Sequence, residues 1–293
     1  MNQAAVTTTC VLLCTITFSA MVGCNSNTAA EPEKQQNTKV VTDGTEPPKS
    51  GNPADESGPR RPQRTGSGTA AREKAAEADK YLFALFLKEE NDQTVAMRRV
   101  LEEAMEKVAD RADSVEVNIT DASEKTLVDE FGLDYAPMPL ILALAPNGAV
   151  TGGFPKQVET QQLLEAFASP CMEKCMKRLQ ENKLVFLCVQ NASTASSDAA
   201  MEGVRRFKAD ARFAQATEIV MLDPADAAEA RFLEDLQVDP GTKEAVTVFL
   251  APGGALAMYE GPTDKDELVA TLQKASSACG PGSCGPGGCP PRE

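Results

Sequence analysis

The sequence predicts an α/β protein built from two tandem domains, each with a central mixed sheet flanked by helices. From about residue 73, short apolar runs alternate with amphipathic stretches, as strands and helices do. The same order of elements then occurs a second time, which indicates an internal repeat. Between residues 24 and 70, large apolar residues are almost absent. A segment of that composition cannot offset its ordering entropy, so we expect a disordered linker over residues 24–72.

The first repeat, residues 73–170, predicts the order β-α-β-α-β-β-α. It opens with Tyr81–Leu87, a continuous apolar run typical of a strand buried on both faces. The elements expected after it are a helix over 94–112, a strand over 114–119, a helix over 124–131, strands over 140–144 and 149–154, and a helix over 160–167.

The second repeat, residues 171–276, opens with an additional helix over SPCMEKCMKRLQ and then follows the same order. Lys183–Val189 matches Tyr81–Leu87, and an Ala-Pro-x-Gly turn stands in both repeats. Counting back from that turn, Pro139 corresponds to Ala245. The elements expected are strands over 183–189, 217–222, 246–250 and 255–259, and helices over 197–213, 228–236 and 264–275.

The stretch YAPMPLILALAPNGAVTGGF, taken with this order of elements, resembles the thioredoxin fold over residues 76–168. The resemblance implies two tandem thioredoxin-like domains, with the family's cis-proline at Met138-Pro139 in the first and none in the second. It also implies a peptide-docking edge near residues 136–139. The alternative is that Pro139 serves only the turn.

Neither repeat carries the Cys-x-x-Cys pair that active thioredoxins place between the first strand and its helix. The corresponding segments are KEENDQT, residues 88–94, and QNASTAS, residues 190–196. The acidic side chains of the first would raise a thiol's pKa, whereas catalysis needs it lowered. In this respect the chain resembles the non-catalytic domains of protein disulfide isomerases, which bind partners. We expect no dithiol exchange at these positions.

The N-terminus predicts export. Residues 10–23 form an apolar stretch of signal-peptide length, too short to span a bilayer. It ends in Met-Val-Gly-Cys, which resembles the lipobox of bacterial lipoproteins. That resemblance implies a signal peptide over residues 1–23, lipidation of Cys24, and a periplasm-facing protein anchored in the bacterial cell envelope. The alternative is an ordinary secretory signal and a soluble secreted protein.

Six cysteines remain after Cys24 and the signal peptide. Cys171 and Cys175 lie four residues apart on a predicted helix, so both face one side. Cys188 lies within an apolar strand, where a free cysteine behaves as a small buried hydrophobe.

The last three cysteines lie in a flexible Gly/Pro-rich tail, residues 277–293: Cys279, Cys284 and Cys289. As thiolates they could bind a soft metal, Cu(I) or Zn(II), with Cys171 and Cys175 completing the site. They could instead form a mobile redox arm, or a disulfide clip to the helix of Cys171 and Cys175 or to a partner. A low-complexity tail with no role for its thiols is the remaining interpretation.

The composition excludes several classes of function. A net charge of −14 argues against nucleic-acid binding. The absence of histidine excludes Ser-His-Asp and Cys-His catalysis and histidine-ligated metals. We therefore predict a non-catalytic envelope lipoprotein that binds envelope proteins or peptides, with its tail thiols serving redox coupling or metal binding. The alternatives are a divergent thiol-disulfide oxidoreductase that uses the tail cysteines, and a copper- or zinc-handling protein.

Overall fold

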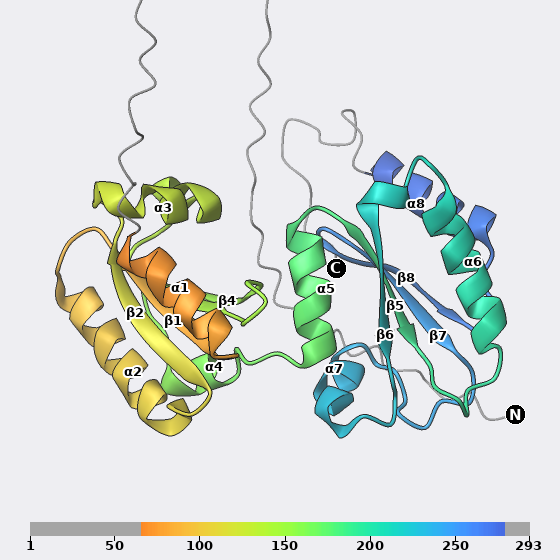
Figure 1. The fold of residues 1–293 in the computed structure, drawn as a ribbon, viewed down its shortest axis with the longest axis horizontal. Coiled ribbons are helices and arrows are strands. Elements are labelled where there is room, and N and C mark those ends of the chain that lie inside the picture. The colour runs from red at the N-terminus through yellow and green to blue at the C-terminus, as the bar shows by residue number, and fades with distance from the viewer. Residues whose placement is uncertain (1–65, 279–293) are drawn as a thin grey trace, which may run out of the picture. The chain divides into compact units, whose positions relative to one another are not determined.

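The computed structural model describes residues 66–278, which contain two separate four-stranded sheets (Figure 1). The strand order is β2-β1-β3-β4 in the first and β6-β5-β7-β8 in the second. In each sheet the two strands nearest one edge run parallel, and the other pairs are antiparallel. Helices flank both sheets. The predicted fold class, two tandem thioredoxin-like domains with mixed sheets, is confirmed.

Domain 1 contains one more helix than the sequence predicts. Its elements are α1 (Ser67–Glu77), β1 (Tyr81–Leu87), α2 (Asp92–Val108), β2 (Ala112–Asn118), α3 (Lys125–Phe131), β3 (Leu140–Leu144), β4 (Val150–Pro155) and α4 (Thr160–Leu164). A short 3₁₀ turn, η1 (Ala122–Glu124), precedes α3, and another, η2 (Leu133–Tyr135), follows it.

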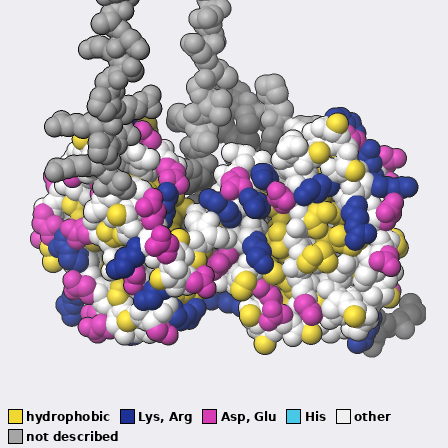
Figure 2. All heavy atoms as spheres, in the orientation of Figure 1, with side chains coloured by type: hydrophobic (Ala, Val, Ile, Leu, Met, Phe, Trp, Pro, Cys, Tyr) yellow, Lys and Arg dark blue, Asp and Glu magenta, His cyan; other side chains and the backbone are white. Residues whose placement is uncertain are grey.

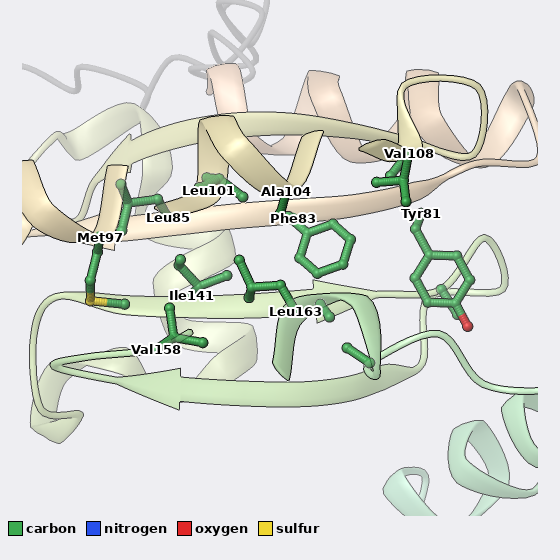
Figure 3. Close-up of a cluster of buried hydrophobic side chains, with 14 of the residues drawn as sticks. Tyr81, Phe83, Leu85, Met97, Leu101, Ala104, Val108, Ile141, Val158 and Leu163 are labelled. Atoms are coloured by element: carbon green, nitrogen blue, oxygen red, sulfur yellow. The ribbon is translucent and has the colours of Figure 1, made fainter. Parts of the chain in front are cut away.

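The strand β1 is buried on both faces, as its continuous apolar run predicts. One face carries Tyr81, Phe83 and Leu85, which pack against α2 and α4. Figure 3 shows these side chains with Met97 and Leu101 of α2 and Leu163 of α4. The other face packs Leu82, Ala84 and Phe86 with residues of α1 and α3. Two apolar layers thus enclose the sheet.

The helix α1 corrects the predicted linker, which was expected to be disordered through residue 72. The helix begins at Ser67 and buries Ala75 against the β1 face of the sheet. Its N-terminus is held from outside: the Ser67 hydroxyl donates to Glu124 Oε1 at 2.7 Å, and the Gly68 N–H donates to both carboxylate oxygens at 3.2 Å. A weakly apolar helix is ordered here by a distant carboxylate, which local pattern does not reveal.

Domain 2 has the same order of elements, including the first helix: α5 (Pro170–Gln180), β5 (Leu184–Val189), α6 (Ser197–Ala209), β6 (Thr217–Leu222), α7 (Ala230–Asp235), β7 (Val246–Ala251), β8 (Gly254–Glu260) and α8 (Lys265–Ala278). A buried glutamate also caps the first helix of domain 2. Glu229, at the end of η4 (Ala227–Glu229), is buried and accepts from the Ser169 hydroxyl and from Cys171 N at 2.9 Å.

The alignment of the repeats differs by one residue from the sequence prediction. Phe86 pairs with Leu140 and Val189 pairs with Val246, so Leu184, and not Lys183, corresponds to Tyr81. A one-residue shift exchanges the two faces of a strand, and only the buried layers decide it. The predicted correspondence of Pro139 with Ala245 agrees with the structure, because each residue directly precedes its strand.

Several helices are shorter than predicted. The helix expected over 197–213 ends at Ala209, because Asp210 leaves the helical backbone and its side chain accepts from Arg212 N at 3.1 Å. Phe213 still packs, stacked on Phe207 with ring centroids 4.4 Å apart. The helix expected over 94–112 runs from Asp92 to Val108, since Ala112 already pairs in β2.

Hydrogen bonds join residues on both sides of the junction between domain 1 and domain 2. Ala168 N donates to the Tyr81 hydroxyl at 2.9 Å, and that hydroxyl donates to Glu173 of α5 at 2.5 Å. The Gln180 side chain bonds both main-chain groups of Val150, at 2.9 and 2.7 Å. Within residues 66–278, none of the helices combines the length and apolarity needed to cross a membrane.

Candidate functional site

The site singled out by the sequence is the segment before β3, where the Met138-Pro139 peptide bond is cis. Pro139 is buried, and its carbonyl accepts from Lys156 N at 2.7 Å, which fixes the segment to the chain after β4. Met138 is half-buried. Within residues 66–278 its main-chain N–H and C=O are not hydrogen-bonded. An extended peptide could therefore pair with this residue's backbone.

An aromatic side chain stands beside this backbone. Tyr135, at the end of η2, is 98% exposed, and Pro137 is also exposed. Exposed tyrosine is common in protein-binding surfaces, because it offers a large apolar face and a hydroxyl at little entropic cost. Tyr135, Pro137 and Met138 together form what we call the docking edge.

The loop before α2 occupies the place where an active thioredoxin carries its dithiol. Residues 88–93 are all exposed, and none is a cysteine. Asn91 caps the helix by accepting from Thr94 N at 3.0 Å. Glu90 forms an ion pair with Arg98 at 2.7 Å, and the Arg98 guanidinium lowers the pKa of that carboxyl. The loop is a stable acidic turn that holds no nucleophile.

A shallow cavity of about 270 Å³ lies between the first turns of α2 and residues 156–158. Its lining includes Asp92, Gln93, Met97 and Lys156. Lys156 is also the residue whose N–H bonds Pro139, so the cavity adjoins the docking edge. The thioredoxin-like face of domain 1 thus keeps an open backbone segment and a hollow beside it.

The corresponding segment of domain 2 is closed by its own chain. Ala245 has an N–H where Pro139 has none, and it donates to Ala195 O at 3.0 Å. Ala195 N donates in turn to Lys243 O at 2.7 Å, which makes a parallel bridge with Glu244 between them. The loop of residues 190–196 therefore pairs with the segment before β7, through the residues on either side of Glu244.

The cysteines of domain 2 are free and buried: Cys171, Cys175 and Cys188. The first two lie on α5 and pack in the apolar cluster against β5 and β6. Burial raises the pKa of Cys171 to about 11 and the pKa of Cys175 and Cys188 to about 12. Groups buried as neutral thiols are poor nucleophiles and poor metal ligands in this state.

The other residues predicted to carry chemistry lie outside the described residues: Cys24, Cys279, Cys284 and Cys289. Across residues 66–278 there is no group of three or more Cys, Asp or Glu side chains placed to hold a metal ion. The predicted site that joins the tail thiols to Cys171 and Cys175 therefore stays a prediction.

Two features of the site were missed from the sequence. The exposure of Tyr135 has no pattern signal, since an aromatic residue before a strand is usually buried. The bridge between Ala195 and Glu244 joins residues that are far apart in the chain.

A repeated Asp-Ala-x-Glu at 121–124 and 226–229 is a signal that could have revealed the two buried capping carboxylates.

No protein-family model and no curated protein matches the chain. Among solved structures, the germline-specific thioredoxin Deadhead from Drosophila melanogaster is 17% identical, covers 35% of this chain and 90% of its own, and has a TM-score of 0.28. The first two thioredoxin domains of Saccharomyces cerevisiae Eps1p are 9% identical, with coverages of 71% and 96% and a TM-score of 0.27.

Human ERp44 is also similar, at 9% identity, with coverages of 70% of this chain and 55% of its own and a TM-score of 0.30. Likeness at these identities carries no information on activity. The strand order and the cis-proline before β3 define a protein with tandem thioredoxin-like domains. In both domains, the segment where active thioredoxins carry their dithiol contains no cysteine: residues 88–94 in domain 1 and residues 190–196 in domain 2.

Proposed function

We propose that this chain is a non-catalytic binding protein of the bacterial cell envelope, in which domain 1 docks extended peptide segments of partner proteins. The observation that carries the proposal is the unpaired backbone of Met138 beside the exposed ring of Tyr135. A thioredoxin-like domain without its thiols retains the shape of a peptide site and loses the means to react with what it binds.

Peptide docking can be tested with random peptides displayed on phage and selected against the full chain. Met138→Lys places a charge in the docking edge and should weaken the selected peptides about tenfold or more. The matched control is Glu244→Lys, at the corresponding position of domain 2, where the chain closes the site itself. An equal loss of peptide affinity in both variants, or a selection that yields no peptide, would count against the proposal.

The tail cysteines support a second part of the proposal, redox coupling or binding of Cu(I) or Zn(II). Three thiols on a Gly/Pro-rich segment can converge without strain, and thiolate ligands suit these ions. Native mass spectrometry of protein from an oxidising compartment separates the two roles. A mass excess of one metal ion, lost when Cys279, Cys284 and Cys289 become Ser, supports metal binding. Thiols that resist alkylation until reduced support a disulfide.

The alternative function is thiol-disulfide exchange by the tail. Turnover of insulin disulfides in the presence of a reductant measures it directly. The binding proposal expects no turnover above that of the reductant alone. Turnover that disappears with the three tail serines would establish the oxidoreductase instead, because the buried cysteines of domain 2 remain in that variant.

The envelope location rests on the lipobox-like sequence that ends at Cys24. Expression in a bacterium fed a labelled fatty acid should label the wild-type chain and leave Cys24→Ser unlabelled. Label on both chains, or on neither, would contradict lipidation at this residue.

A further inference from the structure

The two sheets have four edge strands in the described part of the chain: β2, β4, β6 and β8. An edge strand exposes unpaired N–H and C=O groups, and proteins usually protect it with charges or bulges. The register of β4 shifts at Ala143/Leu144, and that of β8 shifts at Phe249/Leu250. The strand β2 is regular but carries Asp113 and Glu116. Three of these edges are therefore protected.

The fourth edge, β6, has no bulge and carries one charged residue, Glu218, at the position that Asp113 has on β2. It pairs with β5 without a register shift. On its α6 side it presents Ile219, which is half-buried, and Met221, which is 48% exposed. By the pairing registers, Met221 corresponds to Glu116 of domain 1. The same place in the fold thus carries an ion-paired carboxylate in one domain and an open apolar side chain in the other.

Cations surround the beginning of this strand. Glu218 is bonded by Lys183 and Lys208, each at 3.1 Å, and lies close enough to Arg178 for the two charges to interact. Figure 2 shows hydrophobic side chains gathered where Figure 1 places β6, with Lys and Arg around them. Lys177, Arg178 and Lys183 also contact Glu181. With Lys208, four cations share two carboxylates, which leaves a local positive surplus on a chain whose net charge is −14.

We propose that β6 is a docking site for an extended, acidic segment of a partner protein, which pairs with the open edge as a fifth strand. Main-chain hydrogen bonds to β6 would provide affinity. Apolar side chains of the segment would cover Ile219 and Met221, and its carboxylates would meet the surrounding cations. Met221 O faces away from β5, since the neighbouring Leu222 O accepts from Gln190 N at the end of β5. Among residues 66–278 its one donor is the Cys171 thiol at 3.3 Å, and a carbonyl oxygen can accept a second hydrogen bond.

Charge favours an acidic partner over a second copy of the chain. Two β6 edges brought together would oppose like-charged rims, which costs free energy. This site and the docking edge of domain 1 consist of different residues. An experiment can therefore reject one of the two proposals without affecting the other.

The probe is a fluorescein-labelled synthetic peptide that alternates Val with Asp or Glu, compared with the same peptide carrying Lys at the acidic positions. Fluorescence anisotropy with the full chain should show saturable binding of the acidic peptide and none of the basic one. Met221→Glu copies the residue of domain 1 and should weaken binding roughly tenfold or more, since it adds a charge and removes apolar contact.

The matched control is Met258→Glu on β8. Met258 has the same residue type and the same exposed fraction, 48%, and lies on the opposite edge of the same sheet. It should leave the affinity for the acidic peptide unchanged. Equal loss in the two methionine variants, or no binding of the acidic peptide, would overturn the proposal. A dimer of the wild-type chain that Met221→Glu dissociates would overturn it in favour of a second copy.

Discussion

At the scale of single residues, two buried carboxylates organise the domains. Glu124 is 3% exposed and Glu229 is 1% exposed, and each accepts from the N–H of the second residue of the first helix in its domain. A carboxylate at a helix N-terminus satisfies donors that the helix cannot, and it lies at the positive end of the helix dipole. Each one joins a segment that precedes the sheet to a turn that follows the second strand.

Removal of either carboxylate should lower the free energy of unfolding. Glu124→Ala and Glu229→Ala each leave buried donors unpaired, which costs about 1–3 kcal/mol. Urea unfolding followed by circular dichroism measures the change. Glu77→Ala, an exposed glutamate at the end of α1, is the control and should change stability by less than about 0.5 kcal/mol. Equal effects for all three would show that the carboxylates do not act as caps.

The three buried cysteines should resist alkylation. Burial raises the pKa of Cys171 to about 11 and of Cys175 and Cys188 to about 12, so near pH 8 each thiol is almost entirely protonated. Because the thiolate is the reactive form, native protein should label slowly at these residues, and unfolding in urea should remove the protection. Peptide mass spectrometry after iodoacetamide treatment resolves each site. Fast labelling of Cys175 at pH 8 would contradict its burial.

At the scale of elements, the contact between α6 and the chain before α8 depends on a glycine. A Cβ at Gly203 would overlap the carbonyl oxygen and the hydroxyl of Thr263. That hydroxyl donates to Ala200 O at 2.7 Å, so it cannot move away without loss of a buried bond. Helix propensity alone disfavours glycine inside a helix, and here close packing overrides it.

Gly203→Ala should therefore destabilise domain 2 by roughly 1–3 kcal/mol, although alanine is the better helix former. Thermal unfolding followed by circular dichroism reports the shift in melting temperature. Glu202→Ala, on the exposed side of the same helix, removes only an ion pair with Arg206 and should change little. A stabilised Gly203→Ala would mean that α6 can move away from Thr263.

At the scale of the whole molecule, the Tyr81 hydroxyl links β1 of domain 1 to α5 of domain 2. It accepts from Ala168 N and donates to Glu173. Burial and the neighbouring Glu173 raise the pKa of Tyr81, so the hydroxyl keeps its proton near neutral pH. Burial also raises the pKa of Glu173.

Tyr81→Phe should remove this link and lower the free energy of unfolding by about 1–2 kcal/mol, since Ala168 N–H loses its acceptor. Urea unfolding of the full chain is the measurement. Tyr135→Phe deletes the same atom from a side chain that is 98% exposed, and it should leave stability unchanged. The hydroxyl has no role in the junction if both variants unfold at the same urea concentration.

The sequence by itself determined the fold class, the repeat and most strands. Tyr81–Leu87 and Thr217–Leu222 have the bounds that their apolar patterns predict, because burial on one or both faces leaves a local record in the residue order. It also determined the chemistry that is missing, since the absence of histidine and of cysteine at residues 88–94 needs no coordinates. The cis-proline position followed from the resemblance to the thioredoxin fold, and the Met138-Pro139 bond is cis in the structure.

Only the tertiary structure decided features that depend on residues far apart in the chain. The helix α1 forms where the linker was expected, because Glu124 caps it from 56 residues away. The one-residue alignment of the repeats follows from which face of β5 is buried against α5. The bridge between Ala195 and Glu244 joins the loop of residues 190–196 to the segment before β7, and β6 pairs with β5 without a bulge. Hydrogen bonds and packing between distant segments have no local periodicity, so no pattern in the sequence records them.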